Sequence, residues 1–170
     1  MCHTIAVGEL LLRRHWLPLV LASAGILLVA GGCTKKPPAI TPVDGTLLLD
    51  DKPLPFAHIQ FYPELADYGS EMNSSAETDA NGNFTLTCHA GGQPGAVVGS
   101  HRVVVIEAAP SRELRGMDAK SQTRLAEHMS KLTNRPIPPE FGNYSKTPLR
   151  ITVSAEQRSY TVQMKRESAP

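Results

Sequence analysis

Val103-Val104-Val105-Ile106 is the strongest strand signal in the 170-residue chain, and it lies within the stretch from Gly99 to Ala108. Four consecutive β-branched residues favour extended backbone. An apolar run of this length is typical of a strand that is covered on both faces. We therefore expect a β-rich domain built around this stretch.

Further strand signals lie on both sides of this run. Residues 56–62 and 158–165 alternate apolar and polar side chains, which is the period of a strand with one buried face. Shorter signals fall at residues 43–49, 75–78, 84–88 and 149–154. Residues 75–88 read as a hairpin whose turn ends at Gly82. About seven short strands separated by turn residues predict an all-β fold of the β-sandwich class.

Residues 110–135 interrupt the β pattern. They are charged and rich in helix formers, and Leu125, Met129 and Leu132 are spaced i, i+4 and i+7. This spacing predicts a short amphipathic helix over residues 123–132, and a mobile insertion between two strands is the alternative. Six basic and three acidic residues give the segment a positive surplus, which suits a solvated face and also suits contact with anionic headgroups or glycans.

The first 32 residues have the layout of a secretory signal peptide. Arg13-Arg14-His15 precedes an apolar run from Trp16 to Ala30, and small residues lead into Cys33. The apolar run is shorter than the roughly 20 residues that a membrane-spanning helix needs. We therefore expect residues 1–32 to be a cleaved leader and the mature chain to be exported, and the paired arginines leave a twin-arginine route open.

Ala30-Gly31-Gly32-Cys33 resembles the lipobox of bacterial lipoprotein signals. The resemblance implies that the Cys33 sulfur receives a diacylglycerol, that the chain is cut before Cys33, and that the new amino terminus takes an acyl chain such as palmitate. Two or more acyl chains hold a protein firmly on a membrane. Residues 33–39 would then be the lipidated cysteine and a Pro-rich spacer, and Thr34 favours the outer membrane of the bacterial cell envelope.

Charge and cysteine content narrow the function classes. The chain has a net charge of +1, and removal of Arg13, Arg14 and Glu9 leaves it formally neutral, so its charge gives no reason to expect nucleic-acid binding. Of the three cysteines, Cys2 leaves with the leader and Cys33 takes the lipid. Cys88 then stands alone in an expected strand, where a buried, inert thiol is expected and no intramolecular disulfide can form.

Three motifs resemble carboxypeptidase regulatory-like (transthyretin-like) domains. Residues 43–57 resemble the opening hairpin of that family, residues 78–84 its T-D-x-x-G-x-F hairpin, and residues 95–105 its following P-G-x-Y-x-V strand. Residues 137–141 and 145–153 resemble the closing part of small bacterial envelope lipoproteins built on the same domain. The chain departs from the family at Asp51 and Phe56, where glycine is usual, and at His101, where an aromatic residue is usual.

This resemblance implies a fold and a domain organisation. The fold is an Ig/transthyretin-like β-sandwich of about seven strands, and the domain covers residues 40–166. Residues 110–135 are its charged insertion, and residues 167–170 are a tail. The family's domain has no catalytic machinery of its own, so we expect this chain not to be an enzyme.

Metal-binding patterns are weak. Asp79, Asn81 and Asn83 have the spacing of a calcium loop, but Phe84 and Ala90 stand where an EF-hand needs Gly and Glu. Turn chemistry is therefore the expectation for this segment. His58, His89 and His101 share no metal-ligand spacing. We expect no catalytic residue, no cofactor and no metal site.

The sequence predicts a lipid-anchored cell-envelope protein that acts as a non-catalytic interaction or structural module, held on the membrane through Cys33. Its partner is an envelope protein or a glycan. Glycan binding is the main alternative function, and the candidate stacking side chains in or beside loops are Tyr62, Tyr68, Phe141 and Tyr144. A transthyretin-like hydrolase is a remote alternative, because the chain ends Glu167-Ser168-Ala169-Pro170 rather than Tyr-Arg-Gly-Ser.

Overall fold

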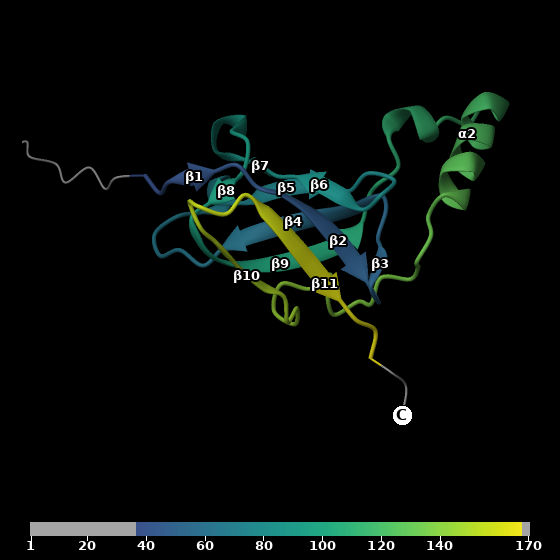
Figure 1. Ribbon diagram of the computed structural model, residues 1–170. Helices are drawn as coiled ribbons and strands as arrows, with labels where there is room; N and C mark the ends of the chain where they lie inside the picture. The colour runs from purple at the N-terminus through teal and green to yellow at the C-terminus, as the bar shows by residue number, and fades with distance from the viewer. Residues whose placement is uncertain (1–36, 168–170) are drawn as a thin grey trace, which may run out of the picture. The chain divides into compact units, whose positions relative to one another are not determined.

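The computed structural model describes residues 37–167, and this part of the chain is mostly β-strand with one α-helix (Figure 1). The predicted leader, Cys33 and the final residues 168–170 lie outside the described residues. The strands are β1 (Ile40–Thr41), β2 (Asp44–Leu49), β3 (Lys52–Pro53), β4 (Ala57–Pro63), β5 (Ser74–Glu77), β6 (Asn83–Thr85), β7 (Thr87–Cys88), β8 (Ala96–Val97), β9 (Gly99–Glu107), β10 (Arg150–Val153) and β11 (Ser159–Met164). Among the described residues, no helix is long and apolar enough to cross a membrane.

The strands form two larger sheets and one short pair. One sheet has the order β10-β9-β4-β5-β7, and the other has the order β11-β2-β3 with β6 also paired to β2. β1 and β8 form the short pair. The pairings are antiparallel except between β2 and β11, which run parallel with Asp44 opposite Ser159 and Leu49 opposite Met164.

The hydrophobic core is built by alternate residues of strands from both larger sheets. β2, β4 and β11 each bury every second side chain, as the period-2 pattern predicts. The core members include Leu47, Leu49, Ile59, Phe61, Phe84, Val103, Val105, Val162 and Met164. One apolar cluster joins the two sheets, so polar side chains lie on their outward faces, where they can contact a ligand.

β9 lies between β10 and β4 in its sheet, and it is not covered on both faces along its whole length. Val103 and Val105 are fully buried and Val104 is 5% exposed, whereas Ile106 is 40% exposed. The prediction of a strand covered on both faces is therefore wrong at Ile106. β9 also hydrogen-bonds to the chain segment that precedes β10. The Val105 N–H donates to the Phe141 carbonyl over 2.9 Å, and Thr147 Oγ1 donates to the Val103 carbonyl over 2.7 Å.

The predicted hairpin over residues 75–88 is only partly present. β5 pairs with β7, with Ser74 opposite Cys88, but β6 leaves this sheet and pairs with β2 in the other one. The expected turn is confirmed: Gly82 has φ 76° and donates its N–H to the Asp79 carbonyl over 3.1 Å. The segment thus connects the two sheets, because Asn83–Thr85 pair with β2.

Around β3, three residues that are not glycine have left-handed backbone conformations, and two of them stand where the carboxypeptidase regulatory-like pattern has glycine. Asp50 and Asp51, which join β2 to β3, have φ values of 52° and 62°, and Phe56 has φ 51°. Glycine adopts this left-handed region freely, whereas a residue with a Cβ is strained there. The chain therefore holds Asp51 and Phe56 in conformations that glycine would adopt at lower cost.

The charged insertion contains a helix. η3 (Arg112–Leu114) is followed by α2 (Ala119–Ser130), and Asp118 caps α2 by accepting a hydrogen bond from the Ser121 N–H over 3.0 Å. The helix alternative is confirmed, although the helix begins four residues before the predicted range of 123–132 and ends at Ser130. No residue of α2 is buried, and Figure 1 shows the helix standing beside the strands rather than over them.

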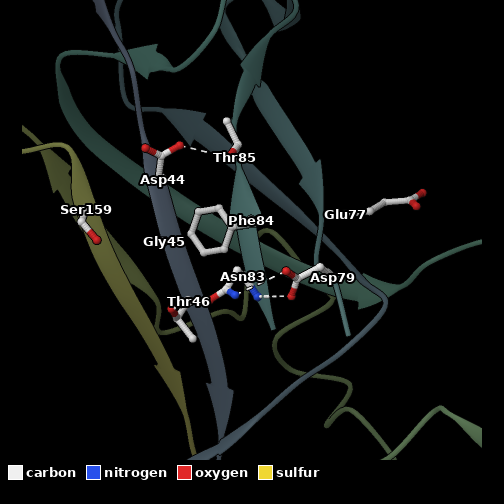
Figure 2. A pocket seen from close by; sticks show the side chains of 9 residues that line it. All are labelled: Asp44, Gly45, Thr46, Glu77, Asp79, Asn83, Phe84, Thr85 and Ser159. Carbon is white, nitrogen blue, oxygen red and sulfur yellow. Dashed lines mark hydrogen bonds between the residues drawn. The ribbon is translucent and has the colours of Figure 1, made fainter. Parts of the chain in front are cut away.

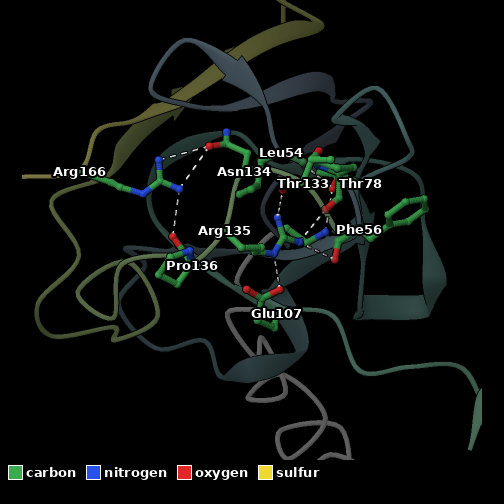
Figure 3. Close-up of polar contacts among 11 residues, drawn as sticks. Leu54, Phe56, Thr78, Glu107, Thr133, Asn134, Arg135, Pro136 and Arg166 are labelled. Carbon is green, nitrogen blue, oxygen red and sulfur yellow. Dashed lines mark hydrogen bonds and ion pairs between the residues drawn. The ribbon is translucent and has the colours of Figure 1, made fainter. Parts of the chain in front are cut away.

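A polar network joins the end of this insertion to the β domain (Figure 3). Asn134 Nδ2 donates to the carbonyl of Leu49 over 2.7 Å, and its Oδ1 accepts from the Arg166 guanidinium. Arg135 Nε pairs with Glu107 over 2.7 Å, and its Nη2 donates to the Pro55 carbonyl over 2.7 Å. These contacts fix the point at which the chain leaves α2 and returns to the sheets.

Candidate functional site

The candidate metal ligands do not come together. His101 is fully buried with its ring 5.6 Å from that of Phe61, whereas His89 is exposed and lies 3.1 Å from Ser75 Oγ. His58 lies on the half-exposed face of β4. Within residues 37–167, no group of three His, Cys, Asp or Glu side chains is placed to hold a metal ion.

Asp79 closes a turn. Its Oδ1 accepts the backbone N–H groups of Asn81 and Asn83, both over 2.8 Å, and its Oδ2 accepts from Asn83 Nδ2 over 3.3 Å. The hydrogen bond from the Asn83 backbone contributes most to lowering the pKa of Asp79 below its ordinary value. Both carboxylate oxygens are therefore used within the turn, as the sequence predicts for this segment.

A polar hollow of about 550 Å³ lies beside this turn (Figure 2). Its polar groups hydrogen-bond with one another: Thr85 Oγ1 donates to Asp44 over 3.0 Å, and Thr46 Oγ1 donates to Asn83 over 3.0 Å. Asp44 also pairs with Arg158 over 2.7 Å, and this bond, with that from Thr85, lowers the pKa of Asp44. The one aromatic side chain that lines it, Phe84, is only 4% exposed. The hollow therefore offers no ring face on which an organic ligand could stack.

Cys88 is buried, as predicted. It is 0% exposed, and its Sγ lies 3.8 Å from the carbonyl oxygens of Glu71 and Met72. The neighbouring His89 is exposed, so the two side chains lie in different environments. This arrangement does not form a Cys–His pair.

The aromatic candidates separate into buried and exposed residues. Phe141 is only 4% exposed and belongs to the core, so its prediction as an exposed stacking residue is wrong. The reason is the hydrogen bonding of its backbone to β9, which draws its ring into the core beside that strand. Tyr68 is half-buried in the loop before η1 (Ser70–Met72). Tyr62 and Tyr144 come together.

Tyr62 and Tyr144 form an aromatic pair at the end of β4. Their ring centroids lie 5.2 Å apart at an interplanar angle of 70°, which is the edge-to-face geometry that aromatic rings prefer. Tyr144 is 46% exposed. Burial, and then the neighbouring Tyr144, raises the pKa of Tyr62, and its hydroxyl donates to Gln60 Oε1 over 2.5 Å.

Arg102 holds this pair in place from β9. Tyr62 and Arg102 are cross-strand neighbours, and the Arg102 Cζ lies 4.6 Å from the centroid of the Tyr144 ring. This distance is that of a cation–π contact. Arg102 Nη1 also donates to the Tyr144 carbonyl over 3.1 Å. One guanidinium thus contacts both the ring and the backbone of Tyr144.

A second arginine adds to the positive charge. Arg150 lies directly opposite Arg102 across the β9–β10 pairing. Glu64 Oε1 lies 3.4 Å from Arg102 Nη2 and 3.7 Å from Arg150 Nε, so one carboxylate is shared by two guanidinium groups. We call Gln60, Tyr62, Glu64, Arg102, Tyr144 and Arg150 the tyrosine–arginine surface. Its formal charge is +1.

Sequence analysis identified the two tyrosines of this surface and missed its charged residues. The strand period places Gln60 and Tyr62 on one face of β4, which was a usable signal, whereas Arg102 joins them through the register of β9 on β4. Arg150 and Tyr144 reach the same place through the register of β10 on β9 and the loop before β10, which no local pattern encodes. A comparison with family models, with curated proteins and with solved structures gave no match for this chain.

Proposed function

We propose that this chain is a lipid-anchored protein of the bacterial cell envelope whose β domain is a non-catalytic binding module. Its fold is compatible with an Ig/transthyretin-like β-sandwich of the carboxypeptidase regulatory-like type. Two larger sheets that share one apolar core, and the positive φ values at Asp51 and Phe56 where that family has glycine, support the assignment. The lipobox-like sequence ending at Cys33 supports export and anchoring on the membrane, with Thr34 favouring the outer membrane.

The tyrosine–arginine surface carries the proposal for what is bound. The sequence left a protein partner and a glycan open as ligands. Protein-binding surfaces are marked by contiguous apolar patches, whereas the exposed large apolar side chains described here, Ile106, Met117 and Met129, are distributed between β9 and the insertion. A tyrosine pair with one exposed ring, flanked by an amide and guanidinium groups, is suited to a sugar ring, which stacks its C–H face on an aromatic ring and hydrogen-bonds through its hydroxyls. We therefore favour a glycan.

A binding assay tests this proposal. The full-length protein is purified from bacterial membranes in detergent and titrated calorimetrically with soluble cell-envelope polysaccharide fragments. The wild-type protein is expected to bind, and Tyr144→Ala is expected to lose binding. Met129→Ala is a matched control, because Met129 is 54% exposed and lies on α2, away from this surface. Equal binding by the wild type and Tyr144→Ala would show that the surface is not the ligand site.

A further inference from the structure

We infer that the glycan recognised by the tyrosine–arginine surface is acidic, and that the open edge of the Arg150 guanidinium binds a carboxylate on the sugar whose ring stacks on Tyr144. This inference rests on the proposed function and names the chemical class of its ligand.

The guanidinium of Arg150 is fixed in position and only partly used. Its Nη1 donates to the carbonyl oxygens of Thr147 and Leu149, both over 2.9 Å. The remaining edge is formed by Nε and Nη2: Nε lies 3.7 Å from Glu64 Oε1, beyond hydrogen-bond distance, and Nη2 has no hydrogen-bond acceptor among the described residues. The side chain is 44% exposed. A guanidinium held along one edge presents the N–H groups of its other edge in a plane, which matches the two oxygens of a carboxylate.

The local charge balance favours an anion. Charge-assisted N–H···O bonds are commonly about 2.7–2.9 Å long, whereas Glu64 lies 3.4 Å from one guanidinium and 3.7 Å from the other. Glu64 therefore holds neither arginine tightly and leaves one positive charge uncompensated. A carboxylate from the ligand would supply the missing negative charge beside Arg150.

Arg102 links Tyr144 to Arg150, because it contacts the Tyr144 ring and is the cross-strand partner of Arg150. Arg102 and Tyr62 both contact the Tyr144 ring, and Tyr144 is nevertheless 46% exposed, so part of it is available to a sugar ring. The Arg102 bond to the Tyr144 carbonyl fixes the loop that carries the ring. Arg102 is thus a positioning residue for Tyr144, and Arg150 is the residue that would contact the acidic group.

Oligogalacturonate and its methyl ester provide a matched pair of probes. They have the same sugar rings, and only the first carries free carboxylates. We expect the full-length detergent-purified protein to bind oligogalacturonate at least about tenfold more tightly than the ester, because a charge-assisted hydrogen bond contributes enough free energy for such a ratio. The preference is expected to decrease as NaCl is raised, because salt screens exposed charges.

Variants separate this inference from the proposed function. Arg150→Gln is expected to bind the acid and the ester equally, and Tyr144→Ala is expected to bind neither. Arg158→Gln is the matched arginine control, because Arg158 is 71% exposed and pairs with Asp44 on the other sheet, and it is expected to keep the preference for the acid.

Four outcomes would contradict the inference. If the wild type binds the acid and the ester equally, or if Arg150→Gln keeps the preference, the carboxylate assignment is wrong while glycan binding stands. Binding of a sulfated or phosphorylated sugar in place of the uronate would also overturn the carboxylate assignment. If the wild type binds no envelope polysaccharide and neither probe, the glycan proposal itself fails.

Discussion

The rings of Phe56 and His128 lie 5.3 Å apart and are tilted by 56°, and this contact joins the β domain to the exposed helix α2. Phe56 makes the contact from a left-handed backbone conformation with φ 51°. A residue with a Cβ pays about 1–2 kcal/mol for such a conformation. The position of the helix therefore depends on a strained residue.

Two substitutions at Phe56 separate the strain from the ring contact. Both Phe56→Gly and Phe56→Ala remove the ring, but only glycine also relieves the backbone. We expect Phe56→Gly to be more stable than Phe56→Ala by about 1 kcal/mol, measured by urea unfolding, which reverses the usual order of these two residues. His128→Ala removes the same contact without changing the backbone of residue 56. If Phe56→Ala is the more stable of the two, the strain at this position is negligible.

His101 should make stability depend on pH. Burial lowers its pKa, and its Nε2 has no hydrogen-bond partner in the described structure, whereas its Nδ1 lies 3.0 Å from the Gly99 carbonyl. The unfolded chain therefore binds a proton more readily than the folded chain. Stability is expected to be complete above the ordinary histidine pKa of about 6.5 and to fall as the pH falls from there through the lowered folded value.

Replacement of His101 by an aromatic residue that does not titrate tests this expectation. His101→Phe should reduce the change in unfolding free energy between pH 8 and pH 5, because it removes the buried titrating group. His89→Asn removes an exposed histidine and should leave the pH dependence of the wild type in place. Chemical denaturation at a series of pH values measures both. An unchanged pH profile in His101→Phe would show that another group causes the acid sensitivity.

Arg135 should contribute more to the free energy of unfolding than an ordinary surface arginine does. Its side chain is 16% exposed, and its guanidinium binds Glu107 and the carbonyl oxygens of Thr133 and Pro55 (Figure 3). We expect Arg135→Ala to lower the free energy of unfolding by about 2 kcal/mol, because it leaves partly buried acceptors unpaired. Arg135→Lys should recover little of this, since one ammonium group cannot reach all three acceptors.

The control for Arg135 is the exposed ion pair between Arg158 and Asp44. Arg158→Ala should change stability by less than about 1 kcal/mol, as is usual for surface pairs. Thermal unfolding of the three variants under one condition gives the comparison. If Arg135→Ala and Arg158→Ala lose similar amounts of stability, the network around residues 133–136 does not hold the insertion in place.

Cys33 should decide whether the protein stays on the membrane. Expression in a bacterial host with radiolabelled palmitate is expected to label the wild type, and Cys33→Ser should be unlabelled and should remain uncleaved at this site. Cys88→Ser is the matched control, because Cys88 is buried in the β domain. Labelling of Cys33→Ser would contradict lipidation at Cys33.

Local sequence patterns predicted the longer strands and the insertion well. The alternation in β4 and β11 and the apolar run in β9 depend on neighbouring residues, and so does the helix propensity of α2. The patterns failed where a strand pairs with another strand that is far away in the sequence. Asn83–Thr85 looked like one arm of a hairpin, but its partner is β2, and sequence periodicity holds no information on which strand will be adjacent.

The tyrosine–arginine surface shows the same limit. Tyr62 and Tyr144 could be selected as candidates because they lie in or beside loops, but Phe141 met the same criterion and is buried. What distinguishes them is the contact with Arg102, which depends on the register of β9 on β4 and on the course of the chain before β10. Such contacts can be found only once the fold is known.

The parallel pairing of β2 with β11 constrains when the domain can form. β2 is the first long strand and β11 is the last, so the sheet they share cannot close until the end of the β domain is available. Non-local pairing of this kind makes folding slow. If the chain is exported, as we propose, slow closure is useful: the polypeptide can cross a membrane unfolded, and the domain becomes complete only after its last strand has emerged on the other side.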